Sequence, residues 1–528
     1  MIKVKTNSGS WQSFCDLIER FLAADEVHIT IDGTSVSGYR SPDSPALWIR
    51  DHSDILRAGR FYTEDVWSAA EAFADAQAAS GRVFDYVLTV AATWAGEREN
   101  WERWVRVPVE ADVEYRLVKA AFLAWQASGD DERLARILPS LERALTYATT
   151  HPSRVDPDTG LVKRAYTIDT WDFDYTAGRH PWLNFQITDH TFWGIMHGDN
   201  SGVFESASLL ARLYEYVGEP ARAAEWHRKA AHIKRAANEL LFNGRFYTHF
   251  HKLVDVAIEG VDESEQLSLS NASAITRGMA TRDIATAVLK EYQTRRNRGT
   301  SFAEWFSIDP PFPTGIFGDE KLVAGAYVNG GVMPLVGGEI ALAAFISGQE
   351  KYGVQTLEQY RKMITESGET FLWYFPDGRP STVDTSTSPD AMPTDGWGSS
   401  SMLNALIQGL AGVHDQGAMF RDIVLSPRWL AAGEHFAEVE LAYPASGASM
   451  AYIFNHDADS RSIALSIERT TGEGRINVSV LLPEGRDVES ASRNGQACQV
   501  TMHRVGDSSY AEVEECSGRK NEIEIRYK

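Results

Sequence analysis

The stretch ESASLLARLYEYVGEPARAAEWHRKAAHIKRAANELLF, residues 205–242, contains two amphipathic helical patterns separated by one break. In its first half, the apolar residues recur at the spacing of one helix face: Leu209, Leu210, Leu213, Tyr214 and Val217. The sequence GEP at 218–220 then interrupts the pattern, because glycine and proline end helices. The stretch therefore predicts two antiparallel helices joined by a short turn.

Similar helix pairs are predicted at other points of the chain between about 66 and 413. Two of them are 112–125 with 131–149, and 330–347 with 354–366. An open solenoid of short repeats would show a constant period of roughly 34–47 residues. These hairpins are instead separated by unequal loops rich in Trp, Asp, Gly and Pro. We therefore predict a closed ring of helix pairs, an (α/α)6 toroid, which would gather the loops at one end.

The spacing of the apolar residues changes after Val413. The segments FAEVELAY, SMAYIF, SIALSIE and INVSVLL alternate apolar and polar residues with period two, which is typical of antiparallel strands. At the other end of the chain, an amphipathic helix at 11–23 precedes a possible strand, EVHITIDG. We predict three parts: an N-terminal helix and strand segment packed on the barrel at 1–44, the catalytic barrel at 45–415, and a β-sandwich-like domain at 416–528.

Composition narrows the class of function. The 528 residues are 43% hydrophobic and carry a formal net charge of −22, so a large core is expected and binding to nucleic acid is not. The three cysteines, Cys15, Cys498 and Cys516, form no metal-ligand spacing, which fits a reducing compartment. The first residues lack the apolar run of a secretory signal, and no stretch is apolar enough to span a membrane. We expect a cytoplasmic protein without a cofactor or a metal; its oligomeric state stays open.

Four loop segments combine carboxylates, aromatic residues and helix breakers. They are SPALWIRDHSDILRAG at 44–59, KRAYTIDTWDFDYTAGRHPW at 163–182, GAYVNGGVMPLVGGE at 325–339, and LWYFPDGRPSTVDTSTSPDAMPTDGWGSSSM at 372–402. Cleaving a glycosidic bond requires one carboxylic acid to protonate the leaving oxygen and one carboxylate to activate water or attack the sugar. Tryptophan suits the same site because its ring stacks on sugar faces. The loops therefore favour a carbohydrate enzyme with a small sugar substrate.

The order of these motifs resembles that of known glycosidases. WIRD, TWDFD, YVNGG and TDGWG follow one another as in the (α/α)6-barrel enzymes that include trehalase, the neutral and alkaline invertases, processing α-glucosidase I and the glucosidase part of glycogen debranching enzyme. The resemblance covers about 45–415 and lies more in motif order than in residue identity. It implies a glycoside hydrolase, exo-acting and inverting, for a small α-linked glucoside or related oligosaccharide.

The resemblance also implies roles for particular residues. Arg50 and Asp51 match an Arg-Asp pair that binds hydroxyls of the innermost sugar. Asp172 matches the general acid, whose pKa must be raised by burial or by a neighbouring carboxylate, which Asp169 or Asp174 could supply. Trp171, next to it, is expected to bind substrate. Asn329 lies in a segment that resembles the YxNGG of the invertases and would line the pocket.

The second carboxylate departs from the family pattern. Where the family has Glu, this chain has Trp373 or Tyr374, and neither can act as a base. Three explanations stay open: the base has moved along the loop to Asp384, Asp390 or Asp395; it is Glu369, just before the loop; or the reaction needs no base. We favour Asp384, in the polar run VDTSTSPD. Asp395 and Trp397, at the start of the last helix, are expected to bind substrate, as is Trp373.

Two other functions remain candidates. The loss of the usual Glu would suit a phosphorylase, epimerase or lyase on the same fold, and a phosphorylase would need a cationic phosphate site in the pocket. A catalytically inactive sugar-binding protein would keep the pocket without turnover. His249 and His251 share one side of a strand-like segment, but no third ligand stands at a recognisable spacing for a metal.

Overall fold

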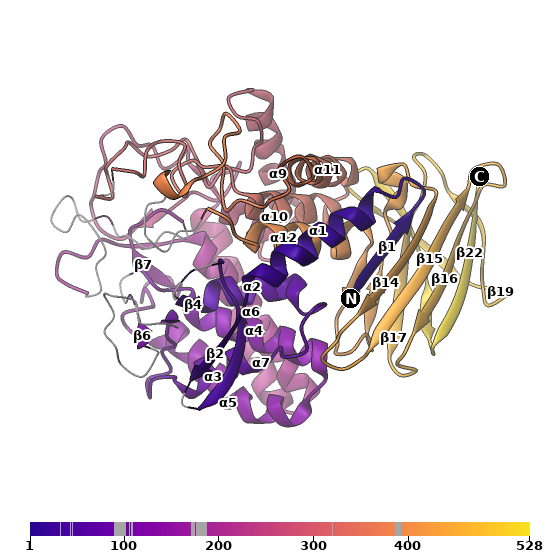
Figure 1. Ribbon diagram of the computed structural model, residues 1–528, viewed down its shortest axis with the longest axis horizontal. Coiled ribbons are helices and arrows are strands. Elements are labelled where there is room, and N and C mark those ends of the chain that lie inside the picture. Colours follow the sequence, from indigo (N-terminus) through magenta and orange to yellow (C-terminus); the bar gives the residue numbers. More distant parts are fainter. Residues whose placement is uncertain are drawn as a thin grey trace.

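The computed structural model describes residues 1–31, 33–42, 44, 46–88, 102–104, 106, 109–169, 175, 187–318, 320–385 and 393–528. Within these residues, twelve α-helices form one body, and most of the strands form a second body at its side (Figure 1). None of the described helices is both long and apolar enough to cross a membrane.

Six helices form an inner layer. Each contacts the next, and the last contacts the first, so the six close into a ring. The inner helices are α2 (Ile49–Gly59), α4 (Val113–Ser128), α6 (His197–Tyr216), α8 (Ser270–Thr276), α10 (Pro334–Ile346) and α12 (Trp397–Asn404). A π-helical segment, η2 (Ala405–Leu410), continues the last of them.

The remaining six helices pack on the outside of this ring. They are α1 (Ser10–Asp25), α3 (Ser68–Asp75), α5 (Asp131–Thr150), α7 (Pro220–Leu241), α9 (Arg282–Asn297) and α11 (Glu350–Ser367). The predicted hairpin at 205–242 is the pair α6 and α7, with a break at Gly218 (φ 80°) and with Pro220 in the first turn of α7. All four other predicted helices are present as α4, α5, α10 and α11.

Burial separates inner helices from outer ones. In α7 the buried residues recur only every three or four positions, as in Trp226, Ala230, Ile233 and Ala237, so a single face meets the core. In α10 every residue from Pro334 to Phe345 is buried, because other helices surround it. Continuous burial along a helix thus indicates a place in the inner layer.

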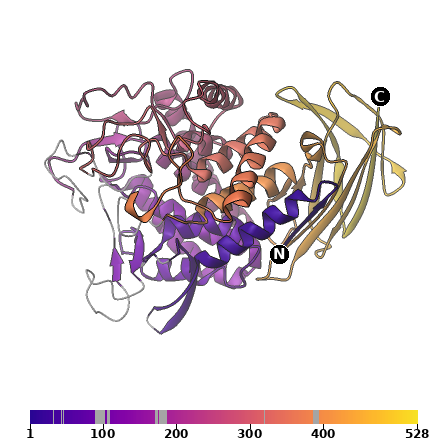
Figure 2. The same cartoon turned by 45° about the horizontal axis from the view of Figure 1, so that its top comes forward.

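The second body consists mainly of two sheets arranged as a β-sandwich-like pair of layers (Figure 2). The larger has the order β1 (Ile2–Thr6), β14 (Phe436–Ala442), β15 (Ser449–Asp457), β16 (Ser462–Arg469), β22 (Lys520–Tyr527), β18 (Val488–Arg493), β19 (Gln496–Ala497). The smaller has the order β12 (Val413–Asp415), β13 (Ile423–Leu425), β17 (Arg475–Leu481), β21 (Ser508–Ser517), β20 (Val500–Val505).

The N-terminal segment joins both bodies. Its first strand, β1, pairs antiparallel with β14, with Val4 opposite Val439. The helix that follows, α1, packs on α11 and α12 of the helical body. The possible strand after it is β2 (Glu26–Ile31), which pairs with β3 (Thr34–Tyr39). The chain therefore ties the two bodies together within its first 25 residues.

Short strands occupy the connections of the helical body. They form the sheets β4 (Ala46–Trp48), β5 (Tyr86–Leu88), β6 (Glu102–Trp104); β7 (Lys163–Ala165), β8 (Trp193–Ile195), β9 (His251–Lys252); and β10 (Leu267–Ser268), β11 (Ile308–Asp309). The first two of these sheets precede α2, α4 and α6, so they support the ends at which inner helices begin.

The contact between α10 and α12 is close enough to require glycine. A Cβ at Gly338 would lie 2.7 Å from the backbone nitrogen of Met402, where no flexible side chain can yield. We expect Gly338→Ala to lower the free energy of unfolding by about 1–3 kcal/mol, measured by urea unfolding. In the control Gly472→Ala, the nearest atoms belong to the Arg519 side chain at 3.4 Å, so stability should hardly change. An unaffected Gly338→Ala variant would contradict the tight closure of the ring.

Candidate active site at the axis of the inner ring

A cavity of about 270 Å³ follows the axis of the inner ring. Every inner helix contributes to its wall, through Asp54, Tyr115, Asp199, Ser273, Glu339 and Trp397 among others. The volume lies just below the roughly 300–1,000 Å³ typical of small-molecule sites. The wall is rich in charged residues, so neighbouring helices are joined by ion pairs as well as by apolar packing.

At the end where the inner helices begin, the ion pairs form a chain of alternating charge. Arg50 of α2 contacts Asp85 at 2.7 Å and Asp112, the residue before α4, at 2.9 Å. Arg116 of α4 then contacts Asp54 of α2 at 2.6 Å. These ion pairs hold the starts of α2 and α4 together. They also give Arg50, which is predicted to bind sugar, two carboxylate partners.

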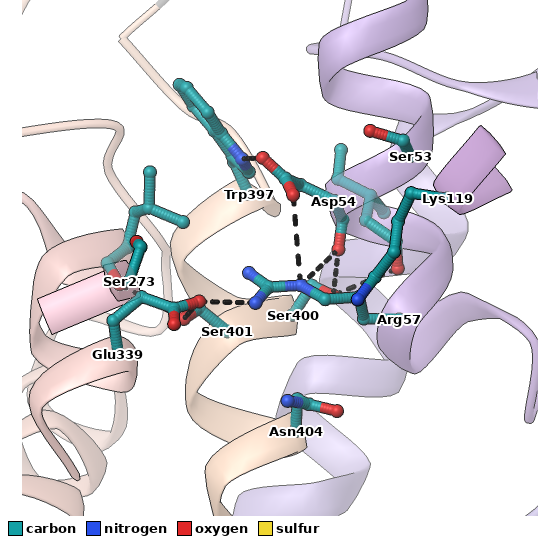
Figure 3. Close-up of polar contacts among 12 residues, drawn as sticks. Ser53, Asp54, Arg57, Lys119, Ser273, Glu339, Trp397, Ser400, Ser401 and Asn404 are labelled. Carbon is teal, nitrogen blue, oxygen red and sulfur yellow. Dashed lines mark hydrogen bonds and ion pairs between the residues drawn. The ribbon is translucent and has the colours of Figure 1, made fainter. Parts of the chain in front are cut away.

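The series of polar contacts continues across the axis of the ring (Figure 3). Asp54 accepts a hydrogen bond from the indole nitrogen of Trp397 at 2.7 Å, at the start of α12. Arg57, one turn further along α2, lies between Asp54 and Glu339 of α10 and forms an ion pair with Glu339. Figure 3 shows these side chains converging from three inner helices. Trp397 is therefore fixed in the wall by a charged partner.

Three carboxylates line the cavity near the starts of α4, α6 and α8. Asp112 keeps a pKa lowered to about 2, because Arg50, Arg116 and Arg164 outweigh the effect of burial. For Asp199 burial dominates: its pKa rises to about 6, despite Arg164 at 3.2 Å, and Asp112 and Asp169 add to the rise. One carboxyl is thus ionised at all ordinary pH values, and its neighbour exchanges a proton near pH 6.

Asp199 also has an oxygen without a partner. It is only 2% exposed, and its Oδ2 atom has no hydrogen bond among the described residues. An unpaired buried oxygen is costly for a carboxylate, whereas a protonated carboxyl carries no charge there. The geometry and the raised pKa therefore describe a carboxylic acid able to donate a proton into the cavity.

Asp169 has a different setting. It accepts hydrogen bonds from the backbone N–H and hydroxyl of Ser270, at 3.0 and 2.8 Å, and so holds the first residue of α8. Its own N–H lies 3.2 Å from Nε2 of His249. Although burial opposes it, the pKa of Asp169 is lowered by the two histidines His197 and His249 and by the bonds from Ser270. This carboxylate positions the wall of the cavity.

A second group of carboxyls lies beside the starts of α2 and α12. Burial raises the pKa of Asp395 to about 6, and the pKa of half-buried Asp51 is raised by burial and by Asp395. Asp395 accepts hydrogen bonds from the Ser41 hydroxyl and the Trp397 backbone N–H. Burial and Asp395 likewise raise the pKa of Asp25. Arg50, Asp51, Asp395 and Trp397, predicted to share one site, therefore do lie together.

The other predicted residues are placed as follows. The amide group of Asn329 contacts the backbone N–H and carbonyl of Phe312, at 2.7 and 3.0 Å, and the carbonyl of Leu322 at 3.1 Å, so it organises its own loop. Buried Trp373 lies 6.5 Å from the Tyr327 ring, centroid to centroid. Trp171 and Asp172 lie outside the described residues, as does Asp390.

The two alternatives for the second carboxylate lie in unlike settings. Asp384 is exposed, on a short 3-10 turn, η1 (Val383–Thr385). Glu369 is half-buried and accepts a hydrogen bond from the backbone N–H of Thr370 at 2.9 Å. It is close enough to Asp25 to contribute to the raised pKa of that residue, so it belongs to the carboxyl group around α12.

Sequence reasoning missed Asp112 and Asp199 as candidate site residues. Asp199 begins a regular amphipathic helix and looks like an ordinary first-turn carboxylate. The signal that could have found it is the polar run HGDNS at 197–201, too polar for a helix start that is entirely buried. No group of three metal-binding side chains occurs in the part of the chain that the structure describes.

The sequence matches no family model and no curated protein. Among solved structures, α-L-rhamnosidase from "Dictyoglumus thermophilum" aligns with a TM-score of 0.61 and 12% identity, over 99% of this chain and 50% of its own. Streptomyces avermitilis α-L-rhamnosidase aligns at 0.57 and 14%, over 99% and 42%. Mannosylglycerate hydrolase of family GH63 from Thermus thermophilus aligns at 0.50 and 14%, over 75% and 99%.

These likenesses show a shared fold. The chain spans half or less of the length of the two rhamnosidases. The three neighbours are glycoside hydrolases by name, so the arrangement of helices and sheets seen here is one that such enzymes use.

The raised pKa of Asp199 makes a prediction about stability. Its pKa is 3.8 in the unfolded chain and about 6 in the folded one, so ionisation destabilises the fold as the pH rises between these values. Asp199→Asn cannot ionise. We expect the variant to gain about 2–3 kcal/mol of unfolding free energy relative to the parent between pH 4 and pH 8. Urea unfolding at both pH values measures this difference; a constant difference would contradict the raised pKa.

Proposed function

We propose that this chain is a glycoside hydrolase built on an (α/α)6 toroid, with its catalytic centre where the inner helices begin. The observation that carries the proposal is Asp199, a buried carboxyl that faces the cavity with its pKa raised to about 6, beside the fixed negative charge of Asp112. Glycosidases need one carboxyl that holds a proton, as Asp199 can, and a second carboxyl that activates water or attacks the sugar. Trp397 in the same wall offers an aromatic surface for a sugar ring.

Asp199 is our first candidate for the general acid. It combines a raised pKa, burial and an unpaired oxygen. The resemblance to trehalase and its relatives assigns this role to Asp172 instead, and that assignment stays a prediction. Asp199 lies in the first turn of the inner helix α6.

Asp112 is a poor general base because its low pKa makes it a weak proton acceptor. For the second carboxylate we now favour Glu369 over Asp384. Glu369 is half-buried beside the carboxyls around α12, whereas Asp384 is exposed. In an inverting enzyme the two catalytic carboxyls stand roughly 6.5–9.5 Å apart, which leaves room for the attacking water.

The substrate we propose is a small neutral α-linked glucoside or related oligosaccharide, cleaved from its end with inversion. The motif order WIRD, TWDFD, YVNGG and TDGWG supports this, as does the small volume of the cavity. Arg50, Asp51 and Asp395 would bind hydroxyls of the terminal sugar, and Trp373 and Trp397 would pack against its ring.

A panel of aryl glycosides and natural disaccharides tests the reaction, with NMR of the first anomer released. Hydrolysis without added phosphate would separate a hydrolase from a phosphorylase, and saturable sugar binding without turnover on any substrate would sink the proposal. Inversion predicts that the first anomer formed is opposite in configuration to the bond cleaved.

The general acid is tested by two variants, Asp199→Asn and Asp172→Asn. We expect the variant that lacks the acid to lose about 10²–10⁴-fold in kcat, since a positioned acid contributes that much. Substrates with a good leaving group should suffer less, because they need little protonation. Asp377→Asn, at an exposed turn where the Asp377 side chain contacts Arg379, is the matched control. If neither variant falls by more than about tenfold, both assignments are wrong.

A further inference from the structure

The axial cavity has two ends of opposite character. Where the inner helices begin, the carboxyls Asp112, Asp169 and Asp199 gather in its wall. The other end lies where α4 and α6 finish and meet β12 of the sandwich: Gln126 donates a hydrogen bond to the Asp415 carbonyl at 2.7 Å. Here the wall contains Arg60, Arg212 and His414. We call this part of the cavity the lower chamber.

The lower chamber is far from the candidate catalytic carboxyls. Asp112, the residue before α4, and Gln126, near the end of α4, are fourteen positions apart (126 − 112). At 1.5 Å per residue this is about 20 Å. A group bound in the lower chamber is therefore too distant to react with a sugar held beside Asp199.

The two arginines of the lower chamber form no close ion pair, although the charge of Asp415 acts on both of them. Neither Arg60 nor Arg212 has an ion pair within 4 Å among the described residues, and Arg212 donates one hydrogen bond to the Gln416 carbonyl. Asp415, a carboxylate in the wall at this end, already accepts hydrogen bonds from two backbone N–H groups and from the Tyr443 hydroxyl. Burial raises the pKa of Asp415 to about 6, so below that pH it no longer offsets the two arginines.

Arg60 is the most telling of these residues. It is 3% exposed, and its Nε and Nη1 atoms have no hydrogen-bond partner among the described residues. Leaving such donors unpaired costs about 1–3 kcal/mol each, more for a charged group. Guanidinium groups are the preferred partners of oxyanions because their planar donors match two oxygens at once.

His414 responds to the positive potential of the chamber. Its pKa is lowered to about 4 by enclosure in the protein and by the charges of Arg212, Arg60 and Lys119. The imidazole keeps an exposed surface, so the chamber is open to small solutes. The chain as a whole carries a net charge of −22, which makes an excess of cations in one chamber a local feature.

We propose that the lower chamber binds a small inorganic oxyanion, phosphate or sulfate, between Arg60, Arg212 and His414. The anion bridges the helical body and the sandwich, because the two arginines belong to the helical body and His414 to β12. The site is independent of the proposed glycosidase centre, and its binding is measured without any sugar.

Isothermal titration with inorganic phosphate and with sulfate, at ionic strength held constant with chloride, tests the proposal. We expect saturable binding of at least one of the two ions and a rise in melting temperature that chloride does not give. Arg212→Met should weaken binding about tenfold or more, the loss expected for one charge-assisted hydrogen bond. Arg235→Met, at an exposed position of outer helix α7, should bind as the parent does.

A second readout guards against a variant that fails to fold. In the parent protein, the imidazole resonances of His414 should shift as phosphate or sulfate is added, and they should not shift with chloride. Absence of saturable binding, unchanged affinity in a folded Arg212→Met protein, or binding that leaves His414 unperturbed would each overturn the proposal. The arginines would then serve only to offset the negative ends of the inner helices.

Discussion

The ion pairs inside the inner ring are the constraint on which the rest of the structure depends. Most helical proteins fill the space between helices with apolar side chains, but here Asp54, Arg57, Arg116 and Glu339 meet at the axis. Taking charges out of water is costly unless each finds a partner, and removal of one partner typically costs about 3–5 kcal/mol. The pairs join α2 to α4 and α10. The same contacts that neutralise the buried charges at the axis therefore also hold the inner helices in a ring.

The direction of the inner helices explains why the two ends of the cavity differ. The starts of α4, α6 and α8 lie together: Asp112 and Asp169 both act on the pKa of Asp199, and Asp169 accepts a hydrogen bond from Ser270. Helix starts carry partial positive charge and helix ends partial negative charge, which favours the carboxyls Asp112, Asp169 and Asp199 at one end and the two arginines of the lower chamber at the other. Asp199 holds its proton against this field because burial outweighs both the helix start and Arg164.

Local patterns predicted much of the fold. The hairpin at 205–242 and the alternating strands after Val413 are properties of neighbouring residues, and both are present as α6 with α7 and as β14 to β17. The pairing of β1 with β14 could not be predicted in this way, because Val4 and Val439 are neighbours only in three dimensions. The contacts that close the ring could not be predicted from local patterns either, because the amphipathic pattern of a helix shows which face is buried and not which helix covers it.

The chemistry of the candidate site could also be predicted only in part, because the partners of a side chain cannot be deduced from its neighbours in the sequence. The motif WIRD drew attention to Arg50 as a ligand for sugar hydroxyls, yet its guanidinium reaches Asp85 and Asp112, which lie 35 and 62 positions further along the chain (85 − 50 and 112 − 50). A residue type tells what a side chain can bind, whereas its partners decide how much of that capacity is left. By holding Asp112 ionised at the start of α4, Arg50 keeps a fixed negative charge beside Asp199, and that charge favours the protonated form of Asp199. The arginine thus acts on the proposed acid through one carboxylate, so its position in the ring contributes to the chemistry whether or not a sugar touches it.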